Sequence, residues 1–241
     1  MYRFSVSTAL LGAALLVAAG CNRTDRVSST GEAHRDATAR NASALVRYVN
    51  LMDAHANTDL YFGDLKVFSG STGDQATGYK DVPSERRDFV LREAARPDGM
   101  EIEKNSEGLS AGKHYTVVAY ENDKGNPELR VVNDEESAPA TGKAKIRLIH
   151  AAAKMEPINV WVPGRTDKLA GESRFSTVST WQEVDPVGSP LEIRAGDEKK
   201  GVRVNVPGGV EAGKLYTFVV GHGPANDLRV IRLVDSPMNT Q

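Results

Sequence analysis

Residues 44–50 read Ala-Leu-Val-Arg-Tyr-Val-Asn, and residues 144–150 read Ala-Lys-Ile-Arg-Leu-Ile-His. Alternation of this kind is typical of a β-strand that lays one face on a hydrophobic core, with Arg47 and Arg147 on the opposite face. Further segments match in the same order: 59–62 with 159–162, 111–116 with 212–217, and 129–132 with 231–234. This order indicates that one structural unit occurs twice in the chain.

Each copy consists of short alternating runs separated by Gly, Pro, Asn and Asp, at the spacing expected of about seven strands in a sandwich. The sequence therefore predicts an all-β protein with two tandem Ig-like, fibronectin-type antiparallel β-sandwiches. We expect the first sandwich at residues 44–133, a linker at 134–143 and the second sandwich at 144–235.

The composition argues against a nucleic-acid partner and against structural cross-links made by cysteines. The 241 residues carry a net charge of -2, with no dense basic patch, which argues against a nucleic-acid partner. The single cysteine, Cys21, can form neither an internal disulfide nor a Cys-rich zinc site.

The first twenty residues are typical of a secretory signal. Arg3 precedes an apolar stretch that is shorter than a membrane-spanning helix requires and that ends in small residues. The sequence Val17-Ala18-Ala19-Gly20-Cys21 resembles the lipobox of bacterial lipoproteins, although Ala18 stands where Leu is usual. That resemblance implies cleavage after residue 20, acylation of Cys21 and anchoring in a membrane, with residues 21–43 as a disordered tether. A plain secretory signal and a buried N-terminal helix are the alternatives.

Asn22 follows the predicted lipidated cysteine. In lipoproteins of Gram-negative bacteria an Asp at this place signals retention at the inner membrane. By this resemblance we expect the protein at the outer membrane of the cell envelope, on its periplasmic or its surface-exposed side.

A Gly-containing turn precedes a Tyr at the start of one strand in each copy. Residues 109–115 read Leu-Ser-Ala-Gly-Lys-His-Tyr and residues 210–216 read Val-Glu-Ala-Gly-Lys-Leu-Tyr. This pattern resembles the tyrosine corner of Ig-like sandwiches, in which the hydroxyl bonds the turn backbone. We assign this structural role to Gly112, Tyr115, Gly213 and Tyr216.

The repeated segments together resemble the bacterial family DUF4397, across both copies. The resemblance implies Ig-like sandwiches, often in tandem and often behind secretion or lipoprotein signals, and it implies no assigned activity. The family pattern has a His after the first strand and an Asp before the next. The second copy keeps His150 but has Asn159, whereas the first keeps Asp59 but has Asn50.

No Walker loop, zinc-protease helix or nucleophile elbow is present in the sequence. We therefore expect a non-enzymatic protein without catalytic residues, cofactor or metal. The loop that holds Asp53, His55, Asp59 and Asp64 leaves a metal site open as an alternative to a solvated loop.

Tyr61 and Trp161 occupy equivalent positions, out of phase with their apolar neighbours. If they face away from the core, they could bind a glycan or a partner; the favoured interpretation is that they cap the core near Arg47 and Arg147. Trp181 is expected in the core. The predicted function is binding or structural support in the envelope by a lipid-anchored protein, with an envelope protein or glycan as partner. A surface adhesin or carbohydrate-binding protein is the alternative, and a hydrolase or metalloprotein is less favoured.

Overall fold

The computed structural model describes residues 43–71, 73, 75–94, 99–196, 201–223 and 227–235. These residues form strands joined by turns and contain no helix, which confirms the predicted all-β class. Accordingly, no helix in this part of the chain could cross a membrane. The predicted signal peptide, Cys21 and the tether up to residue 42 lie outside the described residues.

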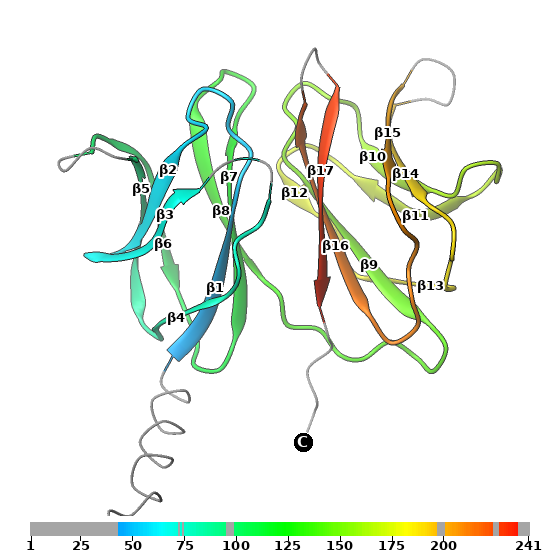
Figure 1. Cartoon of the computed structure of the whole chain (residues 1–241), viewed down its shortest axis with the longest axis horizontal. Coiled ribbons are helices and arrows are strands. Elements are labelled where there is room, and N and C mark those ends of the chain that lie inside the picture. Colours follow the sequence, from blue (N-terminus) through cyan, green and yellow to red (C-terminus); the bar gives the residue numbers. More distant parts are fainter. Residues whose placement is uncertain are drawn as a thin grey trace, which may run out of the picture.

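The first half of the fold contains eight strands in two sheets (Figure 1). They are β1 (Ser43–Asn50), β2 (Thr58–Phe62), β3 (Leu65–Ser71), β4 (Lys80–Pro83), β5 (Arg86–Glu93), β6 (Glu101–Gly108), β7 (His114–Glu121) and β8 (Pro127–Asn133). One sheet has the order β4-β1-β7-β8, and we call it the first inner sheet. The other has the order β3-β2-β5-β6, and we call it the first outer sheet.

The second half contains nine strands. They are β9 (Ala144–His150), β10 (Ile158–Trp161), β11 (Lys168–Ser173), β12 (Thr177–Val178), β13 (Gln182–Val184), β14 (Leu191–Ala195), β15 (Val202–Val206), β16 (Leu215–His222) and β17 (Leu228–Asp235). The second inner sheet has the order β12-β9-β16-β17, with β13 also paired to β9, and the second outer sheet has the order β11-β10-β14-β15.

The two halves share one unusual pairing. β1 runs parallel to β7 and β9 runs parallel to β16, whereas all other strand pairs are antiparallel. The first strand therefore lies beside the seventh in the first half and beside the eighth in the second half, and in both halves the second strand belongs to the other sheet. In immunoglobulin constant domains the first two strands share a sheet, so the structure refines the strand order within the predicted sandwich class.

Alternation in the opening strands fills two separate cores. Val46 and Tyr48 point between the sheets of the first sandwich, and Ile146 and Leu148 occupy the same places in the second. All four side chains are fully or almost fully buried. This burial of apolar surface supplies the main stabilisation of each sandwich.

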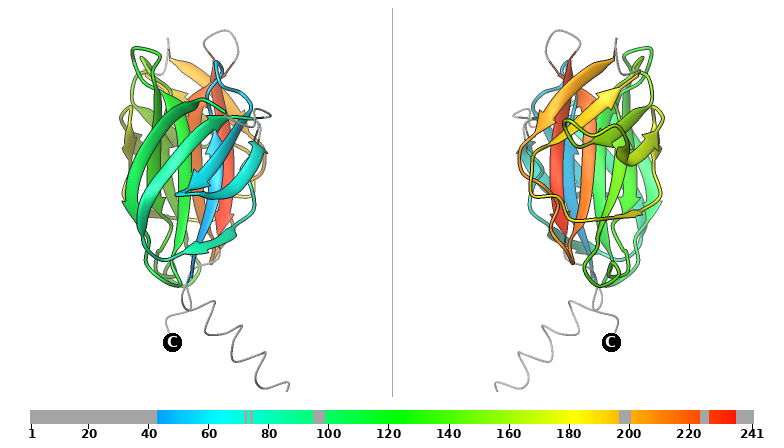
Figure 2. Two further views of the ribbon diagram at one scale, coloured as in Figure 1. Left: turned by 90° about the vertical axis from the view of Figure 1, so that its left-hand side faces the viewer. Right: turned by 90° about the vertical axis from the view of Figure 1, so that its right-hand side faces the viewer.

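The two inner sheets pack against each other, so that the molecule has four layers, with the outer sheets on opposite sides (Figures 1 and 2). A third apolar cluster fills this contact: Val49, Leu51, Val118, Tyr120 and Val132 from the first sandwich, and Ile149, Ala151, Val219, Ile231 and Leu233 from the second. The face of β1 that is opposite the first core is therefore also covered. Figure 1 places the start of β1 and the end of β17 at the same end of the molecule.

Candidate functional site

Tyr61 and Trp161 lie on the outer faces of the two outer sheets. Their neighbours Leu60 and Val160 are buried in the cores, and strand alternation turns the aromatic rings the other way. Both rings are half-buried. The structure thus realises the outward orientation, the one that would permit contact with a ligand or partner.

Each of these rings stacks on a cation of its own sheet. The Arg92 guanidinium lies 5.1 Å from the centroid of Tyr61, and the Arg194 guanidinium lies 4.3 Å from that of Trp161. Such cation–π contacts are weakly stabilising at partly exposed positions. The prediction that the rings cap the core near Arg47 and Arg147 is therefore wrong, because those arginines lie on the inner sheets.

The residue two positions before each aromatic differs between the sandwiches: it is Asp59 in the first and Asn159 in the second. In the first, the Asp59 carboxylate accepts hydrogen bonds from Lys66 Nζ at 2.6 Å and from the backbone N–H of Gly70 at 2.9 Å. The bond to Asp59 raises the pKa of Lys66. In the second, Asn159 is equally buried, and its side-chain Oδ1 has no hydrogen-bond partner.

The His position of the family pattern is structural in this chain. Asn50 donates to Thr58 Oγ1 and to the carbonyl oxygen of His55, and its own oxygen accepts the Met52 N–H. Because Thr58 and Asp59 are neighbours in one strand, they take opposite faces of the sheet. Asn50 and Asp59 therefore form no common site.

His150 takes the corresponding place in the second sandwich. Its Nε2 lies 3.1 Å from the carbonyl oxygen of Glu156, and its Nδ1 accepts the Ala152 N–H. Burial lowers the pKa of His150, the bond to Glu156 opposes that shift, and the nearby charge of His222 adds to it. The ring thereby holds the loop between β9 and β10.

The two predicted tyrosine corners have matching geometry. The Tyr115 hydroxyl oxygen accepts the Ser110 N–H at 3.0 Å, and that of Tyr216 accepts the Glu211 N–H at 2.9 Å. The turns contain Gly112 at φ 72° and Gly213 at φ 80°, a backbone region that side chains other than glycine rarely adopt. These residues fix the turns that enter β7 and β16.

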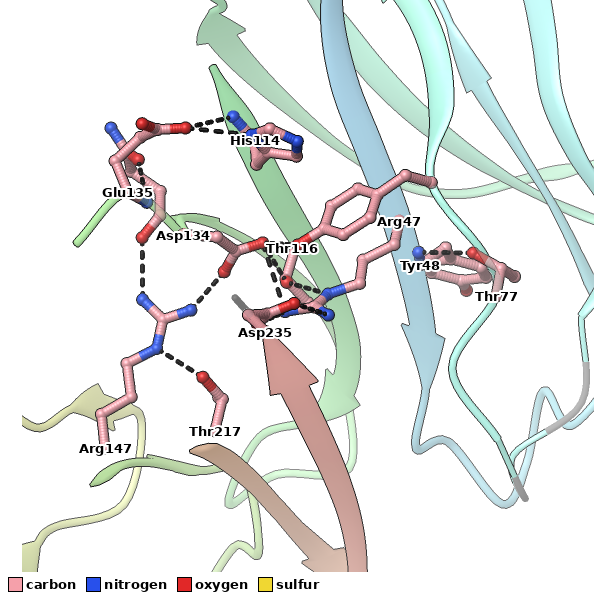
Figure 3. A network of polar contacts seen from close by, with 12 residues as sticks. Arg47, Tyr48, Thr77, His114, Thr116, Asp134, Glu135, Arg147, Thr217 and Asp235 are labelled. Atoms are coloured by element: carbon pink, nitrogen blue, oxygen red, sulfur yellow. Dashed lines mark hydrogen bonds and ion pairs between the residues drawn. The ribbon is translucent and has the colours of Figure 1, made fainter. Parts of the chain in front are cut away.

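A buried polar network joins the two sandwiches (Figure 3). The Arg47 guanidinium, 5% exposed, donates from Nε to Thr116 Oγ1 at 2.7 Å. It also makes a bidentate contact with Asp235, with distances of 2.9 and 2.7 Å. Burial by itself disfavours the charged guanidinium, but the bond to Asp235 and the charge of Asp134 outweigh it and raise the pKa of Arg47. Arg47 is thus a permanent cation.

Arg147 makes the reciprocal connection from the second sandwich. Its Nε donates to Thr217 Oγ1 at 2.8 Å, and its NH2 forms a short contact with Asp134 Oδ1. In each sandwich, therefore, the arginine of the first strand pairs with the aspartate at the end of the other sandwich: Arg47 with Asp235, and Arg147 with Asp134. This pairing has an approximate two-fold relation, like that of a symmetric dimer interface.

Two further aromatic residues cover these arginines. Tyr79 lies 4.7 Å from the Arg47 guanidinium and Trp181 lies 4.5 Å from that of Arg147, measured to the ring centroids. Trp181 is half-buried, so the prediction that it belongs to the core is wrong. Burial and the adjacent Asp134 raise the pKa of Tyr79, so it stays a hydrogen-bond donor.

Sequence reasoning placed Asp134 in the linker and gave Asp235 no role. Asp134 is in fact 6% exposed, accepting hydrogen bonds from Thr116 Oγ1 at 2.6 Å and from Tyr79 Oη at 2.8 Å. The available signal was that both aspartates follow the matched strands 129–132 and 231–234 at nearly the same spacing as the two arginines.

The side chains of the acidic loop that suggested a metal site point to separate partners. Asp53 pairs with Arg229, His55 with Glu93 at 2.8 Å, and Asp59 with Lys66. Asp64 is exposed on the turn after β2. Within the described ranges, no group of three potential metal ligands comes together. Cys21, the predicted lipidation site, lies outside those ranges.

No curated protein matches the chain. Among solved structures, the CBMbc module (family CBM26) of Amy13K from Eubacterium rectale, in complex with maltoheptaose, is 12% identical, with 82% of this chain and 98% of that chain covered. Its TM-score is 0.23.

Residues 44–161 match the model of DUF4397, a domain of unknown function. The match extends from β1 through the whole first sandwich to the end of β10. Residues 44–161 of the chain are therefore identified as a DUF4397 domain.

Proposed function

We propose that the protein is a non-catalytic, lipid-anchored module of the bacterial cell envelope, in which two sandwiches act as one rigid binding or structural body. The observation that carries this proposal is the buried reciprocal pairing of Arg47 with Asp235 and of Arg147 with Asp134. Two domains joined only by a linker would reorient freely. Paired buried charges and an apolar contact between the inner sheets resist such motion.

The polar residues that the sequence singled out have structural partners. Tyr115 and Tyr216 bond their turns, and Asn50 and His150 bond their loops. Their occupied hydrogen-bonding groups favour a structural or binding role over an enzymatic one.

The anchor sets the orientation of this body. Ser43 begins β1 at the end of the molecule where β17 also finishes (Figure 1). A lipid on Cys21 would hold that end toward the membrane. The loops at the other end, such as the one between β9 and β10, would then face away from it and toward an envelope partner.

Membrane fractionation tests the anchor. In a Gram-negative host, the native chain should partition with the outer membrane and into detergent, and Cys21→Ser should be released because it has no thiol to acylate. Asn22→Asp serves as a second arm and should move the protein to the inner membrane. Unchanged membrane partitioning of Cys21→Ser would overturn the lipid-anchored function, whereas cross-linking of the native chain to envelope neighbours would support the binding role.

Glycan binding is the second candidate. It is favoured by one observation, namely that Tyr61 and Trp161 lie half-exposed on the outer sheets. Aromatic rings of this kind provide apolar faces on which sugars can stack. The chain has two tryptophans, so Trp181→Phe leaves Trp161 as the only tryptophan reporter. Titration of that variant with peptidoglycan fragments should change its emission, and a flat response would remove this candidate.

A further inference from the structure

The second sandwich has a cavity of about 570 Å³ on its outer side. It lies between the loop that joins β9 to β10, the outer face of β10 and β11, and the ends of β14 and β15. Its described lining is Lys154, Met155, Glu156, Pro157, Asn159, Lys168, Glu172, Ala195, Gly196, Gly201 and Val202. The volume is within the range of small-molecule sites.

Asn159 is the buried polar residue of this lining. Its side chain is 6% exposed, and its Oδ1 has no partner. Buried polar atoms are nearly always hydrogen-bonded, so an exception needs an explanation. The exposed Lys168 side chain and Gly171 lie over this oxygen, since a Cβ at Gly171 would come 2.8 Å from it and 3.3 Å from Lys168 Cδ. Access to Oδ1 from solvent therefore requires an outward movement of the exposed Lys168 side chain.

The first sandwich shows what happens when the equivalent position is satisfied internally. Tyr61 pairs with Lys66 and Trp161 pairs with Lys168, so the two lysines occupy corresponding places. Lys66 is held by the Asp59 carboxylate. The neutral amide of Asn159 forms no ion pair with Lys168, and its Oδ1 is without a partner.

The charges around the cavity indicate the chemistry of the ligand. Lys154 and Lys168 contribute cations, and Glu156 and Glu172 contribute carboxylates. In the described part of the chain, the one ion pair that involves any of these four side chains is a 4.0 Å contact between Glu172 and Arg174. Met155, Pro157 and Val202 add apolar side chains to the lining.

We propose that this cavity binds a small zwitterionic ligand of the amino-acid or short-peptide class. A ligand N–H donates to Asn159 Oδ1, its carboxylate lies near Lys168 and Lys154, and its ammonium lies near Glu172 and Glu156. Charge-assisted hydrogen bonds of this kind are stronger than neutral ones. The proposal rests on the binding role and not on the lipid anchor, so the fractionation experiment and the following one can fail separately.

The test titrates the purified full chain with alanyl-alanine and follows ¹⁵N–¹H spectra. We expect shifts of the Asn159 side-chain amide and of the Gly196 backbone amide. N-acetyl-alanyl-alanine and alanyl-alanine amide each lack one charge and should bind about tenfold more weakly. Absence of shifts at millimolar dipeptide, equal binding of the blocked peptides, or a response at these residues to maltoheptaose alone would overturn the proposal.

Asn159→Asp is the sharpest variant. The new carboxylate should capture Lys168 as Asp59 captures Lys66, and it should weaken dipeptide binding about tenfold. Asp59→Asn is the matched control in the first sandwich and should leave dipeptide binding unchanged. Thermal unfolding establishes that each variant is folded. If Asn159→Asp is unfolded, Lys168→Gln decides, and wild-type affinity in either folded variant would contradict the site.

Discussion

The Asp235 carboxylate accepts two hydrogen bonds from the Arg47 guanidinium, at 2.9 and 2.7 Å, although 188 positions separate the two residues. This pair links the first described strand to the last. Arg47 is 5% exposed, so its buried charge is compensated by this partner and by the network around Asp134. The pair is therefore where the junction of the sandwiches is most sensitive to substitution.

We expect Asp235→Ala to lower the free energy of unfolding by about 3 kcal/mol, because it leaves a buried arginine without its bidentate partner. Urea denaturation measures this change. The exposed pair of Lys143 with Asp185, at 2.7 Å, is the matched control. Asp185→Ala should change the stability by less than about 1 kcal/mol. Equal effects of the two substitutions would contradict the structural weight given to Asp235.

The close approach of the sandwiches at Gly221 leads to a second prediction. A Cβ at this position would meet three carbons of Leu51 at 3.0 to 3.1 Å. Gly221→Val should therefore destabilise the chain by about 1–3 kcal/mol through overpacking of the junction.

The double variant of Gly221→Val with Leu51→Ala provides the check. Leu51→Ala removes the atoms that the new side chain would strike, so it should recover part of the loss that Gly221→Val causes. Urea denaturation of all four proteins gives the coupling free energy. Strict additivity would show that the two residues do not meet in solution.

His150 should make the stability depend on pH. Its pKa is lowered in the fold by burial, so the unfolded chain takes up the proton first as the pH falls. The unfolded state then binds more protons, and the stability contributed by neutral His150 is lost as the pH drops below about 6.5. His150→Asn copies Asn50 of the first sandwich and should reduce that loss. Melting temperatures at pH 7.5 and 5.0 measure it, and identical pH dependence in both proteins would refute the role.

The tyrosine corners should contribute equally. Tyr115→Phe and Tyr216→Phe each remove the acceptor of one turn N–H, from Ser110 and Glu211 respectively. Each should cost about 1 kcal/mol in the free energy of unfolding. Chemical denaturation of the two variants measures the losses. If neither variant lost stability, the hydroxyl contacts would be incidental.

The sequence was sufficient to predict most strands and their inward faces, because alternation reports directly on burial, but it did not predict β11. Val46 and Tyr48 are examples, and so is the turn pattern around Gly112 and Gly213. The parallel pairing of β1 with β7 was not predicted, since it joins segments that are distant in the chain and have no local signature.

The limits of alternation explain the errors at the site. Alternation correctly turned Arg47 and Arg147 away from the cores, but it carries no information about what covers a sheet from outside. A second sheet does so here, which places these arginines in a buried junction. The same limit applied to Trp181, which covers Arg147 on a loop rather than filling a core. For Tyr61 and Trp161, the outward alternative was the correct orientation.

The pairing of Arg47 with Asp235 also bears on how the protein is made. Arg47 leaves the ribosome early, and its partner is among the final residues synthesised, so the junction stays open until almost the whole chain has emerged. A product that stops short of Asp235 would lack the bidentate partner of Arg47 and would leave Asp134 as the nearby carboxylate. Such a fragment would have a less firmly held junction, so a protease should digest it more readily than the finished chain.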